Sequence, residues 1–99
     1  MITIKNELDT IDSILYETLK ITPFKIDYDI SFGKIATILN RYNLNENSRN
    51  LRFRFTLFMQ EFFDSVPQDQ WDLKDPKFIK QSEDFAIIKF KEWVIEQVT

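Results

Sequence analysis

Apolar residues recur at helical spacing along most of the chain, and residues 51–66 are the richest stretch. This stretch holds five of the ten phenylalanines. One apolar series in it recurs every three or four positions, which places the series on a single side of an α-helix: Leu51, Phe55, Phe58, Phe62 and Val66. Phe53 and Leu57 form a second stripe off that side. A helix that is apolar on more than one side needs several neighbours, so we expect this one at the centre of the fold.

Three further segments have the pattern of amphipathic helices. Residues 3–20, 30–42 and 76–97 each carry an apolar stripe at helical steps. The last segment begins at an Asp-Pro pair, residues 75–76, which suits the N-cap and the first turn of a helix. Ser82 could interrupt this helix, because a serine hydroxyl can cap a helix that restarts at the next residue.

Three short segments also alternate between apolar and polar residues, as half-buried strands do: residues 24–28, 51–57 and 86–91. The first has no evident partner strand. In the second, the helical stripe continues after the alternation has stopped, which favours a helix. The sequence therefore predicts an all-α fold, a small antiparallel four-helix bundle that forms a single domain over residues 1–99. An α+β fold is the alternative if these segments are strands.

The composition argues against an enzyme or a metalloprotein. The chain has no cysteine and no histidine, which removes disulfides, thiolate nucleophiles, the usual zinc ligands and the side chain that titrates near neutral pH. A single glycine cannot build a glycine-rich phosphate-binding loop. The acidic residues do not have the spacing of a calcium-binding EF-hand loop. We therefore expect no catalytic residues, no cofactor and no metal site.

Charge and hydropathy bear on the partners and location of the protein. The formal net charge of −3 argues against free nucleic acid as the main ligand, because phosphate binding needs concentrated lysine and arginine. The same mild acidity suits a basic protein partner. The first twelve residues lack the features of a signal peptide, and no apolar run is long enough to cross a bilayer. We expect a cytoplasmic protein without a membrane partner.

An acidic segment is the first candidate for a partner-binding site. Five carboxylates between residues 61 and 75 face a single local lysine, and a tryptophan lies among them. An aromatic ring surrounded by acids can anchor a basic partner, with the ring supplying apolar burial and the acids supplying attraction and register. The candidate residues are Glu61, Asp64, Asp69, Trp71, Asp72 and Asp75. The alternative is that Trp71 folds back on the core while the acids cap helices and hydrate the loop.

Arginines near the start of the 51–66 helix are a second candidate site, for nucleic acid. Arg49, Arg52 and Arg54 follow a polar turn, as the arginines of a DNA recognition helix can. The apolar content of this helix leaves little face for a DNA groove, and Arg52 and Arg54 point to different sides of it. A small helical DNA-binding regulator or antitoxin is therefore an alternative function. Otherwise we expect the arginines to pair with acids on neighbouring helices.

In small size, mild acidity, richness in aromatic residues and helical pattern, the chain resembles the small immunity proteins that bacteria make against toxic nucleases. The nearest in character are the immunity proteins of colicins and of contact-dependent growth inhibition toxins. This resemblance implies a binding protein that neutralises a basic partner by covering its cationic active site. An inhibitor of a host defence complex, encoded by a phage or plasmid, would act by the same charge mimicry. A helical module whose exposed aromatic residues pair with a second copy is a further alternative.

Overall fold

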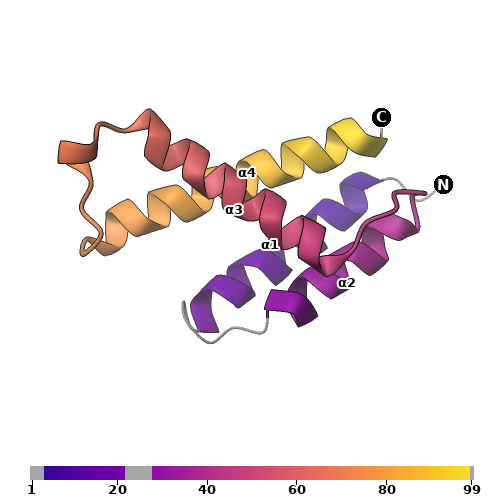
Figure 1. Cartoon of the computed structure of the whole chain (residues 1–99). Helices are drawn as coiled ribbons and strands as arrows, with labels where there is room; N and C mark the ends of the chain where they lie inside the picture. The colour runs from indigo at the N-terminus through magenta and orange to yellow at the C-terminus, as the bar shows by residue number, and fades with distance from the viewer. Residues whose placement is uncertain (1–3, 22–27, 99) are drawn as a thin grey trace.

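Four α-helices make up most of the chain. The structure is a computed structural model that describes residues 4–21 and 28–98. Its elements are the following helices, with a short 3-10 helix before the last (Figure 1): α1 (Ile4–Ile21), α2 (Tyr28–Asn40), α3 (Ser48–Ser65), η1 (Gln68–Gln70) and α4 (Pro76–Val98). The described residues contain no strand.

The all-α bundle that the sequence predicts is confirmed. Residues 51–57 and 86–91, which could have been strands, lie inside α3 and α4. Of the third alternating segment, residues 24–27 lie outside the described part of the chain, and Tyr28 begins α2. Each helix begins and ends within three residues of its predicted bounds.

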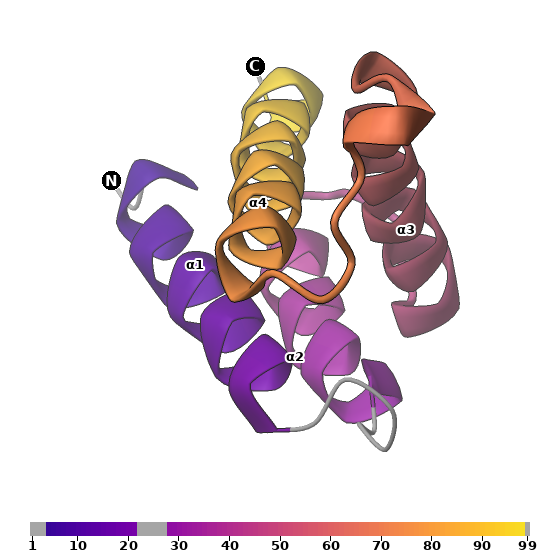
Figure 2. The same ribbon diagram turned by 90° about the vertical axis from the view of Figure 1, so that its left-hand side faces the viewer.

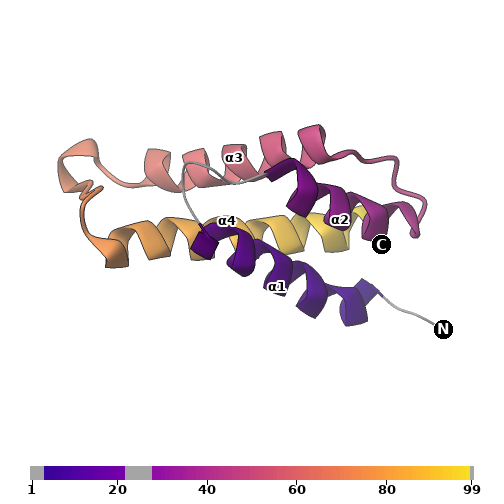
Figure 3. The same cartoon turned by 90° about the horizontal axis from the view of Figure 1, so that it is seen from below.

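The helices form two antiparallel pairs. α1 and α2 run in opposite directions, and so do α3 and α4 (Figure 1). Seen along the bundle, the four helices form a ring in which α1 and α3 each pack against both α2 and α4 (Figure 2). The α3–α4 hairpin extends well past the ends of α1 and α2 (Figure 3), and the molecule is elongated, with extents of 47 × 27 × 20 Å. The far end of this hairpin therefore has fewer neighbours than the body of the bundle.

The core lies where the four helices meet, and each helix contributes buried side chains to it. These are Ile11, Leu15, Phe32, Ile35, Ala36, Ile38, Leu39, Leu51, Phe55, Ala86, Ile87, Phe90 and Val94. The rings of Phe32, Phe55 and Phe90 pack against one another, with centroids 5.7 to 6.2 Å apart. Because these rings come from α2, α3 and α4, one aromatic cluster ties three helices together.

α3 lies at an edge of the bundle, and the prediction that it is central is wrong. Only Leu51 and Phe55 of this helix are buried. The second apolar stripe faces solvent, since the side chains of Phe53 and Leu57 are 65% and 44% exposed. The reason is that α3 packs against α2 and α4 on one side, which leaves the opposite side open (Figure 2). Its second half also runs past the ends of α1 and α2 (Figure 3).

Local side-chain hydrogen bonds set the helix ends. The side chain of Asn47 caps α3 by accepting a hydrogen bond from the backbone N–H of Asn50 at 2.9 Å. Asn43 adopts a left-handed conformation, with φ of 67°, three residues after the end of α2. The carboxylate of Asp75 accepts from the backbone N–H of Lys77 at 3.0 Å, so its predicted role as an N-cap is confirmed.

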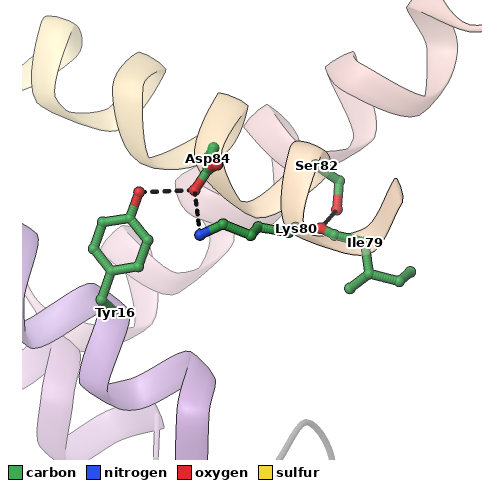
Figure 4. A network of polar contacts seen from close by, with 5 residues as sticks. All are labelled: Tyr16, Ile79, Lys80, Ser82 and Asp84. Atoms are coloured by element: carbon green, nitrogen blue, oxygen red, sulfur yellow. Dashed lines mark hydrogen bonds and ion pairs between the residues drawn. The ribbon is translucent and has the colours of Figure 1, made fainter. Parts of the chain in front are cut away.

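Ser82 does not interrupt α4, which runs unbroken from Pro76 to Val98. The side chain of Ser82 is buried, and its hydroxyl donates to the backbone carbonyl of Ile79 at 2.6 Å (Figure 4). The hydroxyl is therefore satisfied by the preceding turn of its own helix and has no need to cap a new one.

Candidate functional site

The far end of the α3–α4 hairpin has an aromatic cluster of its own. The ring of Phe62 lies against those of Phe63, Phe78 and Phe85, with centroids 5.6 to 5.7 Å apart. Phe63 and Phe78 also pack together at 5.8 Å. These half-buried side chains join the second half of α3 to the first half of α4. The cluster therefore packs the two arms of the hairpin against each other toward its far end.

Trp71 folds back from the connection between α3 and α4 onto the last turn of α3. Its indole N–H donates to the backbone carbonyls of Val66 at 2.9 Å and Phe63 at 3.2 Å, at a helix end where donors for carbonyls are scarce. Its ring also packs against that of Phe63, with 5.3 Å between centroids. Trp71 is therefore held in place, and because it is only half-buried, part of the ring stays at the surface.

A groove of about 470 Å³ lies between α3 and this connection. We call it the distal groove, and it is lined by Thr56, Met59, Gln60, Phe63, Asp64, Trp71 and Leu73. Its apolar surface comes from Met59 and Phe63, one helical turn apart, and from Trp71 and Leu73 of the connection. The side chain of Leu73 is 61% exposed although it is apolar, and most of its neighbours in sequence are polar. Apolar side chains gathered at a concave surface in this way are typical of an interaction site.

The net negative charge of the chain lies in the sequence segment that contains the distal groove. Residues 56–79 contain five carboxylates and two lysines, so this segment alone carries the chain's net charge of −3, and the remaining residues are balanced. Asp64 lines the groove, and Asp69 and Asp72 lie within two residues of Trp71 on the exposed connection. We call these three residues the acidic rim. One carboxylate thus lines the groove, and Asp69, Asp72 and Lys74 lie within two residues of its lining residues in the sequence.

Some acids in the body of the bundle form ion pairs, whereas the residues of the acidic rim form none with a described residue. Asp12 binds Lys91 at 2.6 Å, and the carboxylate of Glu7 lies 3.8 Å from the guanidinium of Arg41. No described lysine or arginine forms an ion pair with a residue of the acidic rim. The field of an unpaired surface carboxylate is not cancelled locally, so the rim can attract a cationic molecule from solution.

The structure divides the six residues that the sequence groups into one candidate site. Trp71 and Asp64 line the distal groove, and Asp69 and Asp72 lie within two residues of Trp71 in the sequence. Asp75 is half-buried and caps α4. Glu61 lines a different hollow, of about 200 Å³, where α3 faces the second half of α4. The local structural role that the sequence offered as an alternative therefore applies to Asp75, and Asp72 also accepts a hydrogen bond, from the backbone N–H of Lys74 at 3.1 Å.

Sequence reasoning missed the residues that make the groove apolar. The apolar stripes of residues 51–66 that the sequence predicts do not include Met59 and Phe63, and the predicted site does not include Leu73. The available signal was a leucine in residues 68–75, which are otherwise polar apart from Trp71. Its importance becomes visible only once Trp71 has brought the connection against α3.

The arginines considered for nucleic-acid binding do not form one surface. Arg54 stacks over the ring of Trp93 on α4, at 4.4 Å from the centroid. Arg52 lies roughly 160° around the helix from Arg54. Arg49 is exposed in the first turn. α3 therefore has no continuous basic face that could follow a phosphate backbone.

A second hollow, of about 480 Å³, lies between α1 and α4, and its polar groups join the two helices (Figure 4). The hydroxyl of Tyr16 donates to the carboxylate of Asp84 at 2.7 Å, and Lys80 lies 3.9 Å from the same carboxylate. This hydrogen bond, together with burial, raises the pKa of Tyr16 to about 12. Burial also raises the pKa of Glu83, which lines the hollow. Charges of both signs meet here, in contrast to the distal groove.

No protein-family model, curated protein or solved structure matches the chain. Within residues 4–21 and 28–98, none of the helices has the length and apolar character needed to span a membrane. The same residues contain no group of three or more carboxylates placed to hold a metal ion.

Proposed function

We propose that this protein binds a basic protein partner at the distal groove and thereby blocks a cationic surface of that partner. One observation carries the proposal: an apolar groove with an exposed leucine is lined by Asp64, and neither this carboxylate nor those of Asp69 and Asp72, close to Trp71 in the sequence, forms an ion pair with a described lysine or arginine. This combination fits a partner whose own apolar contact is surrounded by lysine or arginine.

The acidic rim and the apolar surface of the groove contribute at different stages of binding. Attraction by the carboxylates raises the rate at which a basic partner arrives, and salt weakens this effect. Leu73 and the exposed part of Trp71 then lose water against the partner, which slows its release. Because two hydrogen bonds already hold Trp71, little of its freedom is lost on binding.

The partner that we propose is a toxic nuclease, so that the protein acts in bacteria as an immunity protein. A nuclease site attracts phosphate and is therefore cationic, and the carboxylates of the acidic rim can occupy it in place of substrate phosphates. The same surface would serve an inhibitor directed at a nucleic-acid-binding defence complex. A DNA-binding role has less support, because Arg52 and Arg54 lie on different sides of α3 and Arg54 stacks on Trp93.

The product of the neighbouring gene is the first partner to test, because an immunity gene is expected beside the gene of its toxin. Binding rates are measured with a catalytically inactive form of that product. The test variant combines Asp64→Asn, Asp69→Asn and Asp72→Asn, and the asparagine at position 72 keeps an oxygen for the N–H of Lys74. We expect association to slow about tenfold or more at low salt, and the difference to shrink as salt rises.

Matched controls separate the groove from the general charge of the protein. Asp9→Asn, Glu17→Gln and Glu96→Gln together remove the same number of charges from exposed positions on α1 and α4, and association should stay within about twofold. Leu73→Ser should speed dissociation about tenfold or more, whereas Ile88→Ser, at a similarly exposed residue of α4, should not. Equal effects of groove and control variants would contradict this site, and a neighbouring product that does not bind would contradict the toxin–immunity pairing.

A further inference from the structure

The open side of α3 carries a second apolar surface beside the distal groove. Phe53 and Leu57 lie one helical turn apart there, and both are exposed. Next to them is a hollow of about 240 Å³ lined by Glu46, Asn50, Phe53, Arg54 and Leu57. The views in Figures 2 and 3 show α2 and α4 on the other side of α3. Large apolar side chains are thus presented on a helix face that the described helices leave uncovered.

The order of the charged residues along this open side is unfavourable for the dipole of α3. Arg49, Phe53, Leu57, Gln60 and Asp64 follow one another along it at helical spacing. α3 has no acidic residue in its first turn and no basic residue in its last turn. The helix dipole favours acids at the start and bases at the end, so a basic start and an acidic end are the reverse of the stabilising order.

The charged residues at the two ends of the open side also lack partners within the described chain. Neither Arg49 nor Asp64 forms an ion pair with a described residue. One helix face therefore presents a positive end, an apolar middle and a negative end. Such a face is complementary to a copy of itself turned end to end.

We propose that α3 packs against α3 of a second copy of this chain, antiparallel, across a twofold axis between Thr56 and Leu57. This register places Arg49 opposite Asp64 of the second copy, and by symmetry the same pair forms twice. In this register the two copies of Leu57 lie side by side at the axis, and Phe53 of each copy lies opposite Gln60 of the other, about one turn from its Leu57. The apolar contact at the axis and the charged contacts at its ends thus occur in one register.

The residues on one flank of the open side of α3 are also complementary in this register. Glu61 lies on the same flank of α3 as Asn50 and Arg54, and corresponding flanks face each other in an antiparallel pair. Glu61 of one copy therefore comes opposite Asn50 and Arg54 of the other, where the hollow lies.

The contact is short, so the dimer is weak and exchanges with the monomer. Residues 49–64 span roughly 22 Å of helix, and one pair of helices over that length buries less than a standard interface of about 1,200–2,000 Å². Thr56, Gln60 and Asp64 belong both to this contact and to the distal groove. A second copy and a basic partner therefore exclude one another at α3.

Charge reversal with rescue tests the proposal on the full chain without any partner. Sedimentation velocity measures the fractions of monomer and dimer at chain concentrations from about 10 µM to about 1 mM, a range that suits a weak interface. Arg49→Glu or Asp64→Lys alone sets like charges opposite each other, and each should raise the dissociation constant of the dimer about tenfold or more. The double variant restores opposite charges with the signs exchanged and should dimerise again.

Controls keep the test decisive. Lys34→Glu and Glu17→Lys change the net charge by the same amounts at exposed positions on α2 and α1, and should leave dimerisation within about twofold. Phe53→Ser alters an exposed side chain and should remove the dimer. Circular dichroism confirms that each variant is folded. A wild-type chain that stays monomeric at about 1 mM, or a folded double variant that does not regain the dimer, overturns the proposal.

Discussion

Phe90→Ala removes the ring at the centre of the core. Phe90 is fully buried, and its centroid lies 6.2 Å from those of Phe32 and Phe55 and 5.7 Å from that of Trp93. Truncating a buried phenylalanine costs about 3–5 kcal/mol, because apolar burial is lost and a cavity remains. A domain is stable by only about 5–15 kcal/mol. We therefore expect the midpoint of thermal unfolding to fall by roughly 12–40 °C.

Phe53→Ala is the matched control, because it removes the same atoms from a helix position that is 65% exposed. It should change the free energy of unfolding by no more than about 0.5 kcal/mol. Urea denaturation followed by circular dichroism measures both variants, in dilute solution so that self-association does not contribute. If Phe90→Ala does not fold, Phe90→Leu should still lose about 1 kcal/mol or more. Equal losses for the two alanine variants would refute the core described above.

Three further predictions concern single side chains. Asp75→Ala should lower the free energy of unfolding in urea by about 1 kcal/mol, because the first turn of α4 loses its cap. Trp71→Phe keeps a ring but loses the N–H that binds the carbonyls of Phe63 and Val66, and should cost about 1 kcal/mol in the same assay. Folding raises the pKa of Tyr16 from 10.0 to about 12, so the protonated phenol stabilises the folded state. This contribution is fully present below pH 10.0 and is lost as the pH rises through about 12. Asp84→Ala should lower that pKa in an ultraviolet titration of the phenol, and an unchanged pKa would contradict the assigned cause.

The helices could be predicted because the pattern that defines them is local. The apolar series that begins at Leu51 and Phe55 repeats every turn, and the caps Asn47 and Asp75 act within three residues. The edge position of α3 could not be predicted in the same way. Whether Phe53 is buried depends on which helices lie beside it, and that is decided by contacts between residues far apart in the chain.

The acidic segment was visible in the sequence, but the groove beside it was not. Met59 and Leu73 are fourteen residues apart and line one groove because Trp71 folds back onto α3. Sequence also cannot separate Asp75, which caps a helix, from Asp69, which lies free on the surface of the same connection. Only hydrogen-bond geometry distinguishes an aspartate with a structural task from one that is available to a partner.

Hydrogen exchange of the bound protein tests the central claim most directly, because it reports which surface a partner covers. The chain is compared free and in complex with the inactive product of the neighbouring gene. Binding at the distal groove predicts slower exchange of amides in residues 56–74, with amides of residues 6–15 in α1 unchanged. Slower exchange in α1 and α2, with residues 56–74 unaffected, would contradict the account.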